Sequence, residues 1–379
     1  MPRSPLPRPK IALVLQGGGA RGAYQIGALK AVAEITRRKR SPFQIVCGSS
    51  VGAINAAPFA ASSGDIQHGI RHLERLWRGL HCGKVYDARG LTLFGTSARW
   101  VWTLLFGHLG AEAPAALLDN APLGRLLERE FNRRHIVGAI RSGVLHALCI
   151  TASSYDEGKA ITFFEGAPEL RNWERARRRG VRADIGPRHL LASSSLPFAF
   201  APVRVGDRFF GDGSLRLTAP LSPAIHTGAD RIMIIAARDN RPDQPDPAAA
   251  SPTFGEMIGH ALDILFNDNL DSDHERLSRI NHTLSLLTDE ARSQTPLRNI
   301  DTLMLSPSHD LRSIASRYQH ELPRAIRLMM RSVGSWGSDG RLVSYLLFEA
   351  GYIGALIDLG HDDTMARADE IREFLDVRA

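Results

Sequence analysis

Short, unbroken runs of apolar residues recur along the chain, and each is bounded by glycine or by polar turn residues. Runs that do not alternate between apolar and polar positions are typical of strands buried on both faces, as in parallel sheets covered by helices. We therefore predict buried strands in five segments: KIALVLQG, FQIVCG, VLHALCITA, DRIMIIAA and DTLMLSP.

The segments between these runs carry apolar residues at helical spacing. AYQIGALKAVAEI and DIQHGIRHLERLW are the clearest examples, and their apolar faces consist of Ile26, Leu29, Val32 and Ala33 in the first and Ile66, Ile70, Leu73 and Trp77 in the second. Strands and helices in alternation predict a layered α/β domain with right-handed crossovers.

The pattern changes towards the end of the chain, where everything from Asp310 onwards is helical in character. We therefore predict three parts: a flexible basic N-terminus at residues 1–9, an α/β domain at 10–308, and an all-helical C-terminal extension at 309–379 packed on the core. Two further segments look irregular. The stretch 80–114 mixes glycine with aromatic residues and is predicted to be a lid or cap, and 239–252 is predicted to be a loop.

The chain has 379 residues and a net charge of +7, with a pI near 9.6. A basic balance favours contact with anionic surfaces, either phospholipid or nucleic acid. The sequence contains no DNA-reading helix or zinc motif that would support nucleic-acid binding. The basic clusters 37–40 and 171–182 are candidates for seating the protein on anionic lipid, although a run of charges is more often simply a solvated face.

Three cysteines, Cys47, Cys82 and Cys149, are too few and too scattered for a disulfide framework, and none forms a C-x-x-C pair. We expect neither a metal site nor a cofactor, and a reducing, intracellular setting. No apolar run reaches the roughly 20 residues that a membrane span requires; the nearest is 98–110. We therefore expect a soluble, cytoplasmic protein that at most lies on a membrane surface.

Gly48-Ser49-Ser50-Val51-Gly52 fits the pattern G-x-S-x-G, with an apolar strand before it and a helix-compatible segment after it. In such a strand–turn–helix elbow the flanking glycines remove Cβ atoms that would collide with nearby backbone, and the central serine oxygen points out of the turn. Ser50 is therefore the candidate nucleophile and Ser49 a bystander. A loop whose serines only cap the helix is the alternative.

A second glycine-rich segment, LQGGGARGAYQIG, follows the first predicted strand and opens the first predicted helix. Its Gly17, Gly19 and Gly22 match a dinucleotide-binding fingerprint, but the acidic residue expected about 20 positions later is absent. Consecutive glycines also expose backbone N–H groups at a helix N-terminus, which would stabilise an oxyanion. Arg21 would add charge to this loop or buttress it. A tight turn with close helix packing remains the alternative.

A serine nucleophile needs a proton acceptor. The histidines late enough in the chain to serve are His226, His260, His274, His282, His309, His320 and His361. None of them lies in a glycine-flanked loop after a strand. Asp212 is a better candidate, because it stands between Gly211 and Gly213, after the strand-like RVGDRFF and before a proline-started helix. The alternative is that GDG forms a type I′ hairpin turn.

Four segments, in this order, resemble the patatin-like phospholipases. GGGARG (17–22) resembles the oxyanion loop of that family, GSSVG (48–52) its nucleophile elbow, and DGS (212–214) its D-G-G/A acid motif, while ASSSLPFAFAPV (192–203) is similar to the A-S-x-x-x-P-x-x-F-x-P stretch that precedes the acid. The resemblance covers residues 10–237. Ser214 departs from it, because the family usually has glycine or alanine there.

The resemblance implies a three-layer α/β/α sandwich with a mostly parallel sheet, followed here by the helical extension. It also implies a Ser–Asp dyad, in which Ser50 attacks an acyl carbonyl, Asp212 accepts the proton, and amides of Gly17, Gly18 and Gly19 hold the oxyanion. Because an ordinary carboxylate is a weak base, we expect an apolar pocket to raise the pKa of Asp212. The expected substrates are fatty-acyl esters such as phospholipids. An acyltransferase and a non-enzymatic lipid-binding regulator are the alternatives.

Overall fold

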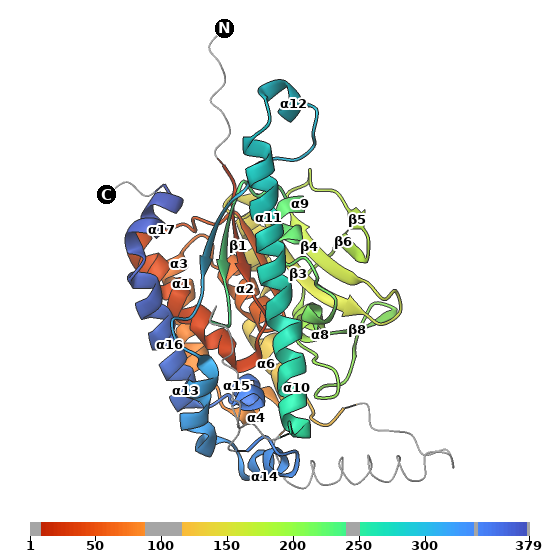
Figure 1. Cartoon of the computed structure of the whole chain (residues 1–379), viewed down its shortest axis with the longest axis vertical. Coiled ribbons are helices and arrows are strands. Elements are labelled where there is room, and N and C mark those ends of the chain that lie inside the picture. Colours follow the sequence, from red (N-terminus) through yellow and green to blue (C-terminus); the bar gives the residue numbers. More distant parts are fainter. Residues whose placement is uncertain (1–8, 88–115, 240–250, 337–339, 377–379) are drawn as a thin grey trace.

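The computed structural model describes residues 9–87, 116–239, 251–336 and 340–376. Within these ranges the chain forms one ten-stranded sheet between layers of helices (Figure 1). The strand order is β10-β9-β1-β2-β3-β4-β6-β5, and the hairpin β7–β8 joins the sheet through β8 and β3. The strands are β1 (Ile11–Leu15), β2 (Ile45–Ser49), β3 (Ala147–Ser154), β4 (Ala160–Gly166), β5 (Trp173–Arg175), β6 (Arg178–Arg182), β7 (Val203–Val205), β8 (Arg208–Gly211), β9 (Arg231–Ile235) and β10 (Asp301–Leu305).

The five predicted apolar runs are the five neighbouring strands β10, β9, β1, β2 and β3, and all of these pair in parallel. Beyond β3 the sheet becomes mixed, because β4 pairs antiparallel with β3 and β5 antiparallel with β6. Since the five parallel strands point the same way, their carboxyl ends share one edge of the sheet, where loops and ligand sites gather in α/β folds. Ser50 follows β2 at this edge.

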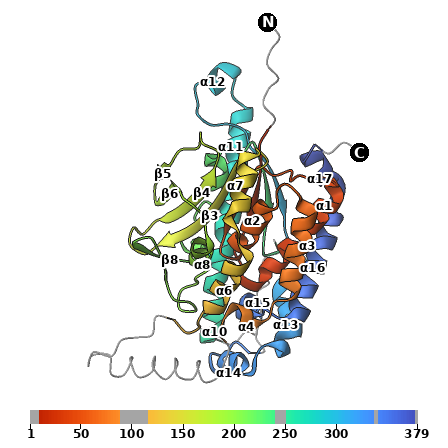
Figure 2. The ribbon, with the colours of Figure 1, turned by 180° about the vertical axis from the view of Figure 1, so that it is seen from behind.

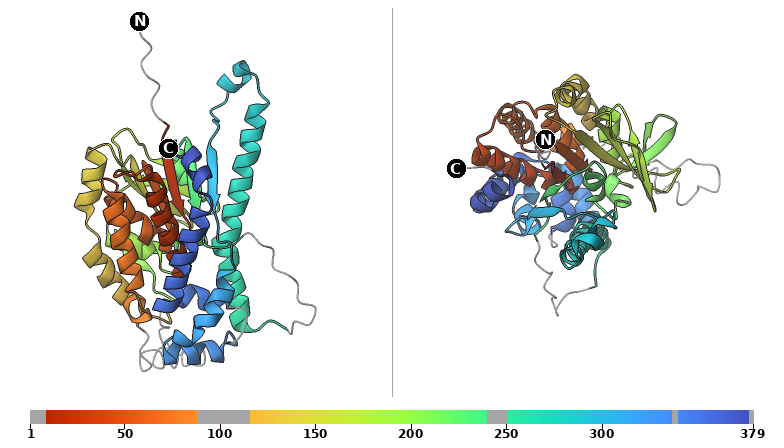
Figure 3. Two further views of the ribbon diagram at one scale, coloured as in Figure 1. Left: turned by 90° about the vertical axis from the view of Figure 1, so that its left-hand side faces the viewer. Right: turned by 90° about the horizontal axis from the view of Figure 1, so that it is seen from above.

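Helices cover both faces of the sheet (Figures 2 and 3). On one face Leu13 and Leu15 of β1 belong to the same apolar cluster as residues of α1, α2, α3 and α16; on the other, Ala12 and Val14 pack with α9 and α11. The mostly parallel α/β/α sandwich is thus confirmed. These helices are α1 (Ala23–Thr36), α2 (Val51–Ala61), α3 (Ile66–Arg78), α9 (Ser222–His226), α11 (Asn269–Ser285) and α16 (Ala350–Met365).

The remaining helical segments frame the edge of the sheet or extend from it. They are η1 (Gly19–Gly22), α4 (Cys82–Val85), α6 (Ala121–Glu130), α7 (Arg133–Arg141), α8 (Pro187–Ser193), η3 (Gly213–Leu215), α10 (Phe254–Asp263), η4 (Ile264–Asp268), α12 (Asp289–Ser293), α13 (Leu311–Tyr318), η5 (Gln319–Glu321), α14 (Arg324–Ser332), α15 (Arg341–Leu346) and α17 (Ala368–Phe374). The π-helical η4 joins α10 to α11, so the three form one long rod (Figure 1).

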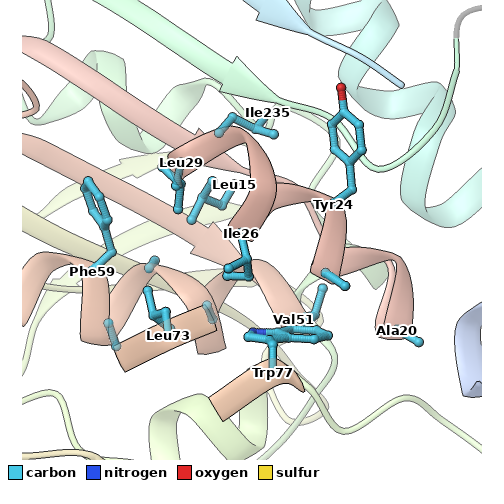
Figure 4. Packing of buried hydrophobic residues seen from close by; sticks show 14 of the residues in the cluster. Leu15, Ala20, Tyr24, Ile26, Leu29, Val51, Phe59, Leu73, Trp77 and Ile235 are labelled. Carbon is cyan, nitrogen blue, oxygen red and sulfur yellow. The ribbon is translucent and has the colours of Figure 1, made fainter. Parts of the chain in front are cut away.

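The larger core lies between the sheet and α1, α2 and α3. Figure 4 shows Leu15, Ile26, Leu29, Phe59 and Trp77 packed in this layer. Every residue on the two predicted helical faces is buried. These residues are Ile26, Leu29, Val32 and Ala33 in α1 and Ile66, Ile70, Leu73 and Trp77 in α3. The 3.6-residue spacing of apolar positions therefore identified the core-facing side of α3 correctly, whereas α1 is buried on nearly all sides because α16 covers it as well.

The described residues after 310 are helical apart from short connections, which confirms the C-terminal helices. These helices share the main core with the sheet, since Leu305 of β10, Leu311 of α13 and Leu356 of α16 belong to one cluster. Two glycines let α16 lie against α1: a Cβ at Gly27 would lie 1.9 Å from the Ile357 carbonyl oxygen, and one at Gly360 would lie 2.1 Å from that of Tyr24. The boundary at 308/309 stays a prediction.

Other details differ from the expectation or lie outside it. The strand-like segment RVGDRFF is two short antiparallel strands, β7 and β8, because Gly206 adopts a φ of 63° and turns the chain between them. The basic segment 171–182 contains the edge hairpin β5–β6. Residues 88–114 of the predicted lid, which include 98–110, lie outside the described residues, as do most of the predicted loop 239–252 and residues 1–8.

Replacing Gly360 by alanine tests the α1–α16 crossing. Because the added Cβ would clash with backbone, we expect the free energy of unfolding to fall by about 1–3 kcal/mol or more. Gly138→Ala is the matched control: Gly138 is an exposed glycine inside α7 with open space around its Cβ position, and alanine should stabilise by about 0.5–1 kcal/mol. Urea unfolding of both variants checks this, and equal effects of the two changes would contradict it.

Candidate active site

Ser50 occupies a strained turn between β2 and α2. Its φ of 54° and ψ of −129° are unusual for a residue with a side chain, and such a conformation costs on the order of 1–3 kcal/mol. Two hydrogen bonds hold it: the Ser50 N–H donates to Ser193 Oγ at 2.9 Å, and the Ser50 carbonyl accepts from the Ala53 N–H at 2.9 Å. Strained backbone conformations of this kind cluster at functional sites.

The glycines on either side of Ser50 stand where backbone segments touch. A Cβ at Gly48 would lie 2.3 Å from the Gly52 carbonyl oxygen, and a Cβ at Gly52 would lie 2.1 Å from the Leu15 carbonyl oxygen at the end of β1. The elbow therefore packs directly against the neighbouring strand, as expected for G-x-S-x-G. Ser49 points elsewhere and lines a separate cavity of about 20 Å³.

Asp212 follows β8 and is 1% exposed. Its Oδ2 accepts a hydrogen bond from Ser50 Oγ at 2.5 Å, and its Oδ1 accepts one from the Ser214 N–H at 2.9 Å. The chain then enters η3 and α9, so GDG is not the turn of a hairpin. A Cβ at Gly213 would lie 2.1 Å from the Thr151 carbonyl oxygen, which explains why the acid turn requires a glycine after the aspartate.

The surroundings of Asp212 change its basicity. Burial raises the pKa of the Asp212 carboxyl to about 6, even though hydrogen bonds from Ser50 and Ser214 stabilise the ionised form and act in the opposite direction. A carboxylate with a pKa near 6 is a much better proton acceptor than an ordinary aspartate and is still mostly ionised at neutral pH.

The glycine loop passes beside Ser50 and Asp212. After Gly17 and Gly18 the chain enters η1, and Gly19 lines the same cavity as Ser50 and Asp212. Gly19 has a φ of 56°, and a Cβ there would lie 2.3 Å from the Tyr345 carbonyl oxygen, so both its backbone conformation and its surroundings require glycine. Of the three glycines expected to hold an oxyanion, Gly19 thus lies at the wall of this cavity, whereas Gly17 lines the separate cavity beside Ser49.

A buried set of amide side chains holds this loop in place. Gln25 Nε2 donates to the Gln16 carbonyl oxygen at 2.7 Å, and Asn55 Nδ2 donates to the carbonyl oxygen of Gly22 at 3.1 Å. Asn55 also accepts from Trp77 Nε1 at 2.8 Å. The glycine loop is therefore tied to α1, α2 and α3 at once. Gly22 itself packs against Val51, the first residue of α2.

Arg21 is fully buried behind the loop and does not line the cavity. Its guanidinium donates to Asp263 Oδ1 and Tyr345 Oη, both at 3.1 Å, and to Ser344 Oγ at 2.7 and 2.9 Å. It also lies 3.9 Å from the centre of the Tyr345 ring. Of the two uses expected for Arg21, these contacts correspond to buttressing, with partners in α10 and α15.

The cavity beside Ser50 has a volume of about 70 Å³ and is walled mostly by apolar side chains. Its lining comprises Gly19, Ser50, Val51, Ile54, Leu76, Trp77, Leu80, Val85, Leu123, Leu126, Ser194, Leu196, Phe200, Asp212, Phe266, Tyr345, Leu346 and Phe348. These residues come from segments distributed over almost the whole chain, and the last three belong to the C-terminal helices and the residues that follow α15. A small apolar cavity ending at a serine and a carboxyl fits the reacting end of an acyl chain.

Several residues in or beside the cavity were not identified from the sequence. Ser193 accepts from the Ser50 amide and donates to the Thr151 carbonyl oxygen at 2.6 Å, so it fixes the elbow; it lies in the quoted segment 192–203, but no role followed from the motif. For Phe266, Tyr345 and Phe348 no motif exists. Their helical patterns predict only core positions.

The late histidines that were weighed against Asp212 make contacts away from Ser50. Examples are His226 stacked on Trp173, His274 bonded to Thr302 and His361 bonded to Glu34. Within residues 9–87, 116–239, 251–336 and 340–376, no group of three or more His, Cys, Asp or Glu side chains is arranged to hold a metal ion. No helix in those ranges combines the length and apolar character needed to cross a bilayer.

Comparisons with known proteins agree on one family. The family model for patatin-like phospholipases matches residues 13–225, more than half of the chain. Over 61 residues the chain is 48% identical to mouse patatin-like phospholipase domain-containing protein 7, a match that covers 16% of this chain and 4% of that protein.

Solved structures similar to this chain include VipD from Legionella pneumophila and human GIVD cytosolic phospholipase A2. VipD is 13% identical with a TM-score of 0.38, and the match covers 96% of this chain and 67% of VipD. The human enzyme is 10% identical with a TM-score of 0.46, and the match covers 97% of this chain and 60% of that protein. The chain therefore spans only part of the length of each of these proteins.

The raised pKa of Asp212 has a consequence for stability. Between pH 4 and 6 the folded protein binds a proton that the unfolded chain has already released, so stability falls as pH rises through this window. We expect the wild type to lose on the order of 3 kcal/mol relative to Asp212→Asn between pH 4 and 7. Chemical unfolding over this pH range measures it, with Asp207→Asn, at a carboxylate that is 89% exposed, as the control for charge. A difference that does not vary with pH would contradict the expectation.

Proposed function

Because the chain belongs to the patatin-like phospholipase family, we propose that it is a serine lipid acyl hydrolase that uses Ser50 and Asp212 as a catalytic dyad. The observation that carries this proposal is the 2.5 Å hydrogen bond from Ser50 Oγ to Asp212 Oδ2, made in a buried site at the edge of an apolar cavity. A nucleophile bonded to its base is the arrangement that covalent catalysis needs.

In the first half of the reaction, Ser50 Oγ attacks the carbonyl carbon of the ester and its proton passes to Asp212 Oδ2. The negative charge that develops on the carbonyl oxygen is stabilised by amide N–H groups of the glycine loop, around Gly17, Gly18 and Gly19. One such donor typically contributes about 10²–10³ in rate. When the tetrahedral intermediate collapses, the bond from the carbonyl carbon to the leaving oxygen breaks, and Asp212 returns the proton to the alcohol that departs.

In the second half, a water molecule attacks the acyl group on Ser50. Asp212 takes one proton from this water, the same amides hold the second oxyanion, and the proton returns to Ser50 Oγ as the fatty acid leaves. The Asp212 carboxylate thus acts twice as base and twice as acid, which a pKa near 6 suits better than an ordinary aspartate value would.

The substrate class follows from the walls of the cavity. Leu76, Leu80, Leu123 and Leu126 offer apolar surface to an acyl chain whose carbonyl lies beside Ser50. The Arg21 guanidinium faces away from this space into its own network. We therefore propose fatty-acyl esters, phospholipids among them, as substrates.

Substitution of the dyad tests the proposal. Ser50→Ala should abolish labelling by a fluorophosphonate and lower kcat/KM for a p-nitrophenyl acyl ester on the order of 10⁴-fold or more, because no other hydroxyl replaces the nucleophile. Asp212→Asn should lower it by about 10²–10⁴-fold. Ser49→Ala, whose side chain lies at the separate 20 Å³ cavity, should stay within a few-fold of the wild type. Labelling that survives Ser50→Ala would overturn the assignment.

The pH dependence of the reaction tests the role of Asp212. The carboxyl must be ionised to accept the serine proton, so kcat/KM for a neutral ester should fall tenfold per pH unit below an apparent pKa of about 6. Initial rates from pH 4 to 8, taken at pH values where circular dichroism shows a folded protein, measure this acidic limb of the pH–rate profile. An acidic limb that stays near pH 4 would show that the pocket does not raise the pKa of the base above the ordinary aspartate value.

A further inference from the structure

Four large apolar side chains are unusually exposed in the part of the chain that the structure describes. These are Phe198 at 77%, Leu286 at 72%, Leu328 at 68% and Phe254 at 63% exposed. Leu286 lies between α11 and α12 at the top of the molecule in Figure 1, while Phe254 begins α10 and Leu328 lies in α14, at the bottom. Gly19, which lines the same cavity as Ser50, packs against α15, and α15 lies in the lower part of Figure 1 as well.

Phe198 stands directly at the catalytic cavity. Its neighbours Leu196 and Phe200 both line the cavity, whereas the Phe198 ring lies in solvent. Phe198 also has a φ of 64°, which is costly for a bulky residue and persists only where the surroundings impose it. A large aromatic ring is therefore held in water, between two residues that line the cavity, in a backbone conformation that its own preferences oppose.

Helices α10 and α14 carry further exposed apolar side chains, and the two helices are joined to each other. Gly255 N–H donates to the Val333 carbonyl oxygen at 2.7 Å, so the first turn of α10 is fastened to the end of α14. Phe254 and Met257, the latter 52% exposed, project from that turn. At the other end of α14, Pro323 borders the same surface hollow as Pro122 and Arg125 of α6, and α6 also lines the catalytic cavity.

The charge of α14 is of one sign. Its sequence RAIRLMMRS contains Arg324, Arg327 and Arg331 and no acidic residue, with Leu328 exposed among them. The Arg331 guanidinium lies 5.0 Å from the centre of the Trp336 ring, an arrangement of cation and aromatic suited to a membrane interface. The nearby carboxylate of Glu256 accepts from the Thr253 N–H at the start of α10, so it is engaged in capping that helix.

The two basic clusters noted in the sequence are placed less favourably than α14 for binding anionic lipid near the catalytic cavity. Residues 37–40 precede β2, while Ser50 follows it, so the cluster lies at the opposite end of the strand from the catalytic site. In the second cluster, Arg182 donates to the carbonyl oxygens of Gly166, Ala167 and Leu170, so its guanidinium is engaged within the fold beside the β5–β6 hairpin.

We propose that Phe198, Phe254, Met257, Leu328, Arg324 and Arg331 form a docking face that binds the surface of an anionic phospholipid bilayer, so that the catalytic cavity opens towards the lipid. The apolar side chains enter the interface and the arginines meet the headgroup phosphates. The role of the docking face rests on the proposed function, because it would bring the cavity to its lipid substrate. Membrane binding itself is measured without any catalytic step.

Sedimentation with vesicles of phosphatidylcholine containing 30% phosphatidylglycerol tests the apolar part of the docking face. The double variant Phe254→Asp with Leu328→Asp should partition at least tenfold more weakly than the wild type. Leu286→Asp, an equally exposed leucine at the opposite end, should partition as the wild type does. Turnover of a short, water-soluble ester should stay within twofold in all these variants, because none of the changed residues lines the cavity.

A second pair of variants tests the charges. Arg324→Gln with Arg331→Gln should weaken partitioning by about fivefold per arginine at low salt, and the difference should vanish in 0.5 M salt or on vesicles of phosphatidylcholine alone. Arg37→Gln with Arg40→Gln removes the same charge at the opposite end and should have little effect.

Two results would overturn the docking face. One is equal partitioning of the wild type and the Phe254/Leu328 double variant. The other is a concentration-dependent dimer in analytical ultracentrifugation that the double variant abolishes while vesicle binding persists, which would make this face a contact between copies of the chain. Vesicle binding without hydrolysis of any acyl ester would instead contradict the proposed function and leave the docking face supported.

Discussion

A carboxylate kept out of water, with only neutral hydrogen-bond donors beside it, is the constraint on which the site depends. Asp212 receives bonds from Ser50 and Ser214, and burial raises its pKa. The chain contains a second buried aspartate with the opposite character. Burial alone would raise the pKa of Asp263 too, but Arg21 and Tyr345 hold it below its ordinary value. A buried charge with a cationic partner stabilises structure, whereas one without such a partner retains affinity for a proton.

Holding Asp212 against Ser50 requires backbone segments from distant parts of the sequence to meet at the edge of the sheet. The elbow after β2 meets the end of β1 at Gly52, and the turn after β8 meets β3 at Gly213, so closely that neither glycine leaves room for a side chain. Hydrogen bonds from Ser193 then fix the elbow to β3. The site is thus rigid because it is made of packed backbone, and the strain at Ser50 is sustained by these contacts.

The elements around the site could be predicted where a short stretch of sequence alone determines the local structure. Apolar runs identified the five parallel strands, because strands buried on both faces cannot alternate, and the glycines of 17–22 and 48–52 marked positions where only a residue without Cβ fits. Local patterns could not reveal what completes the site. Tyr345 and Ser344 look like ordinary core residues of a short helix, and their contacts with Arg21 span more than 300 positions. The π-helical turn that brings Phe266 to the cavity likewise depends on packing and on the bond from Gln16 Nε2 to the Phe266 carbonyl oxygen.

The network around Arg21 also bears on how the protein is made. Translation proceeds from the amino end, so the glycine loop, Ser50 and Asp212 all emerge from the ribosome before Ser344 and Tyr345 have been polymerised. Until then the buried guanidinium of Arg21 lacks the hydroxyl partners that orient it and the loop lacks the backbone of α15 behind Gly19. A nascent chain that already carries every motif of the family therefore lacks the packing that holds its glycine loop until α15 has been synthesised.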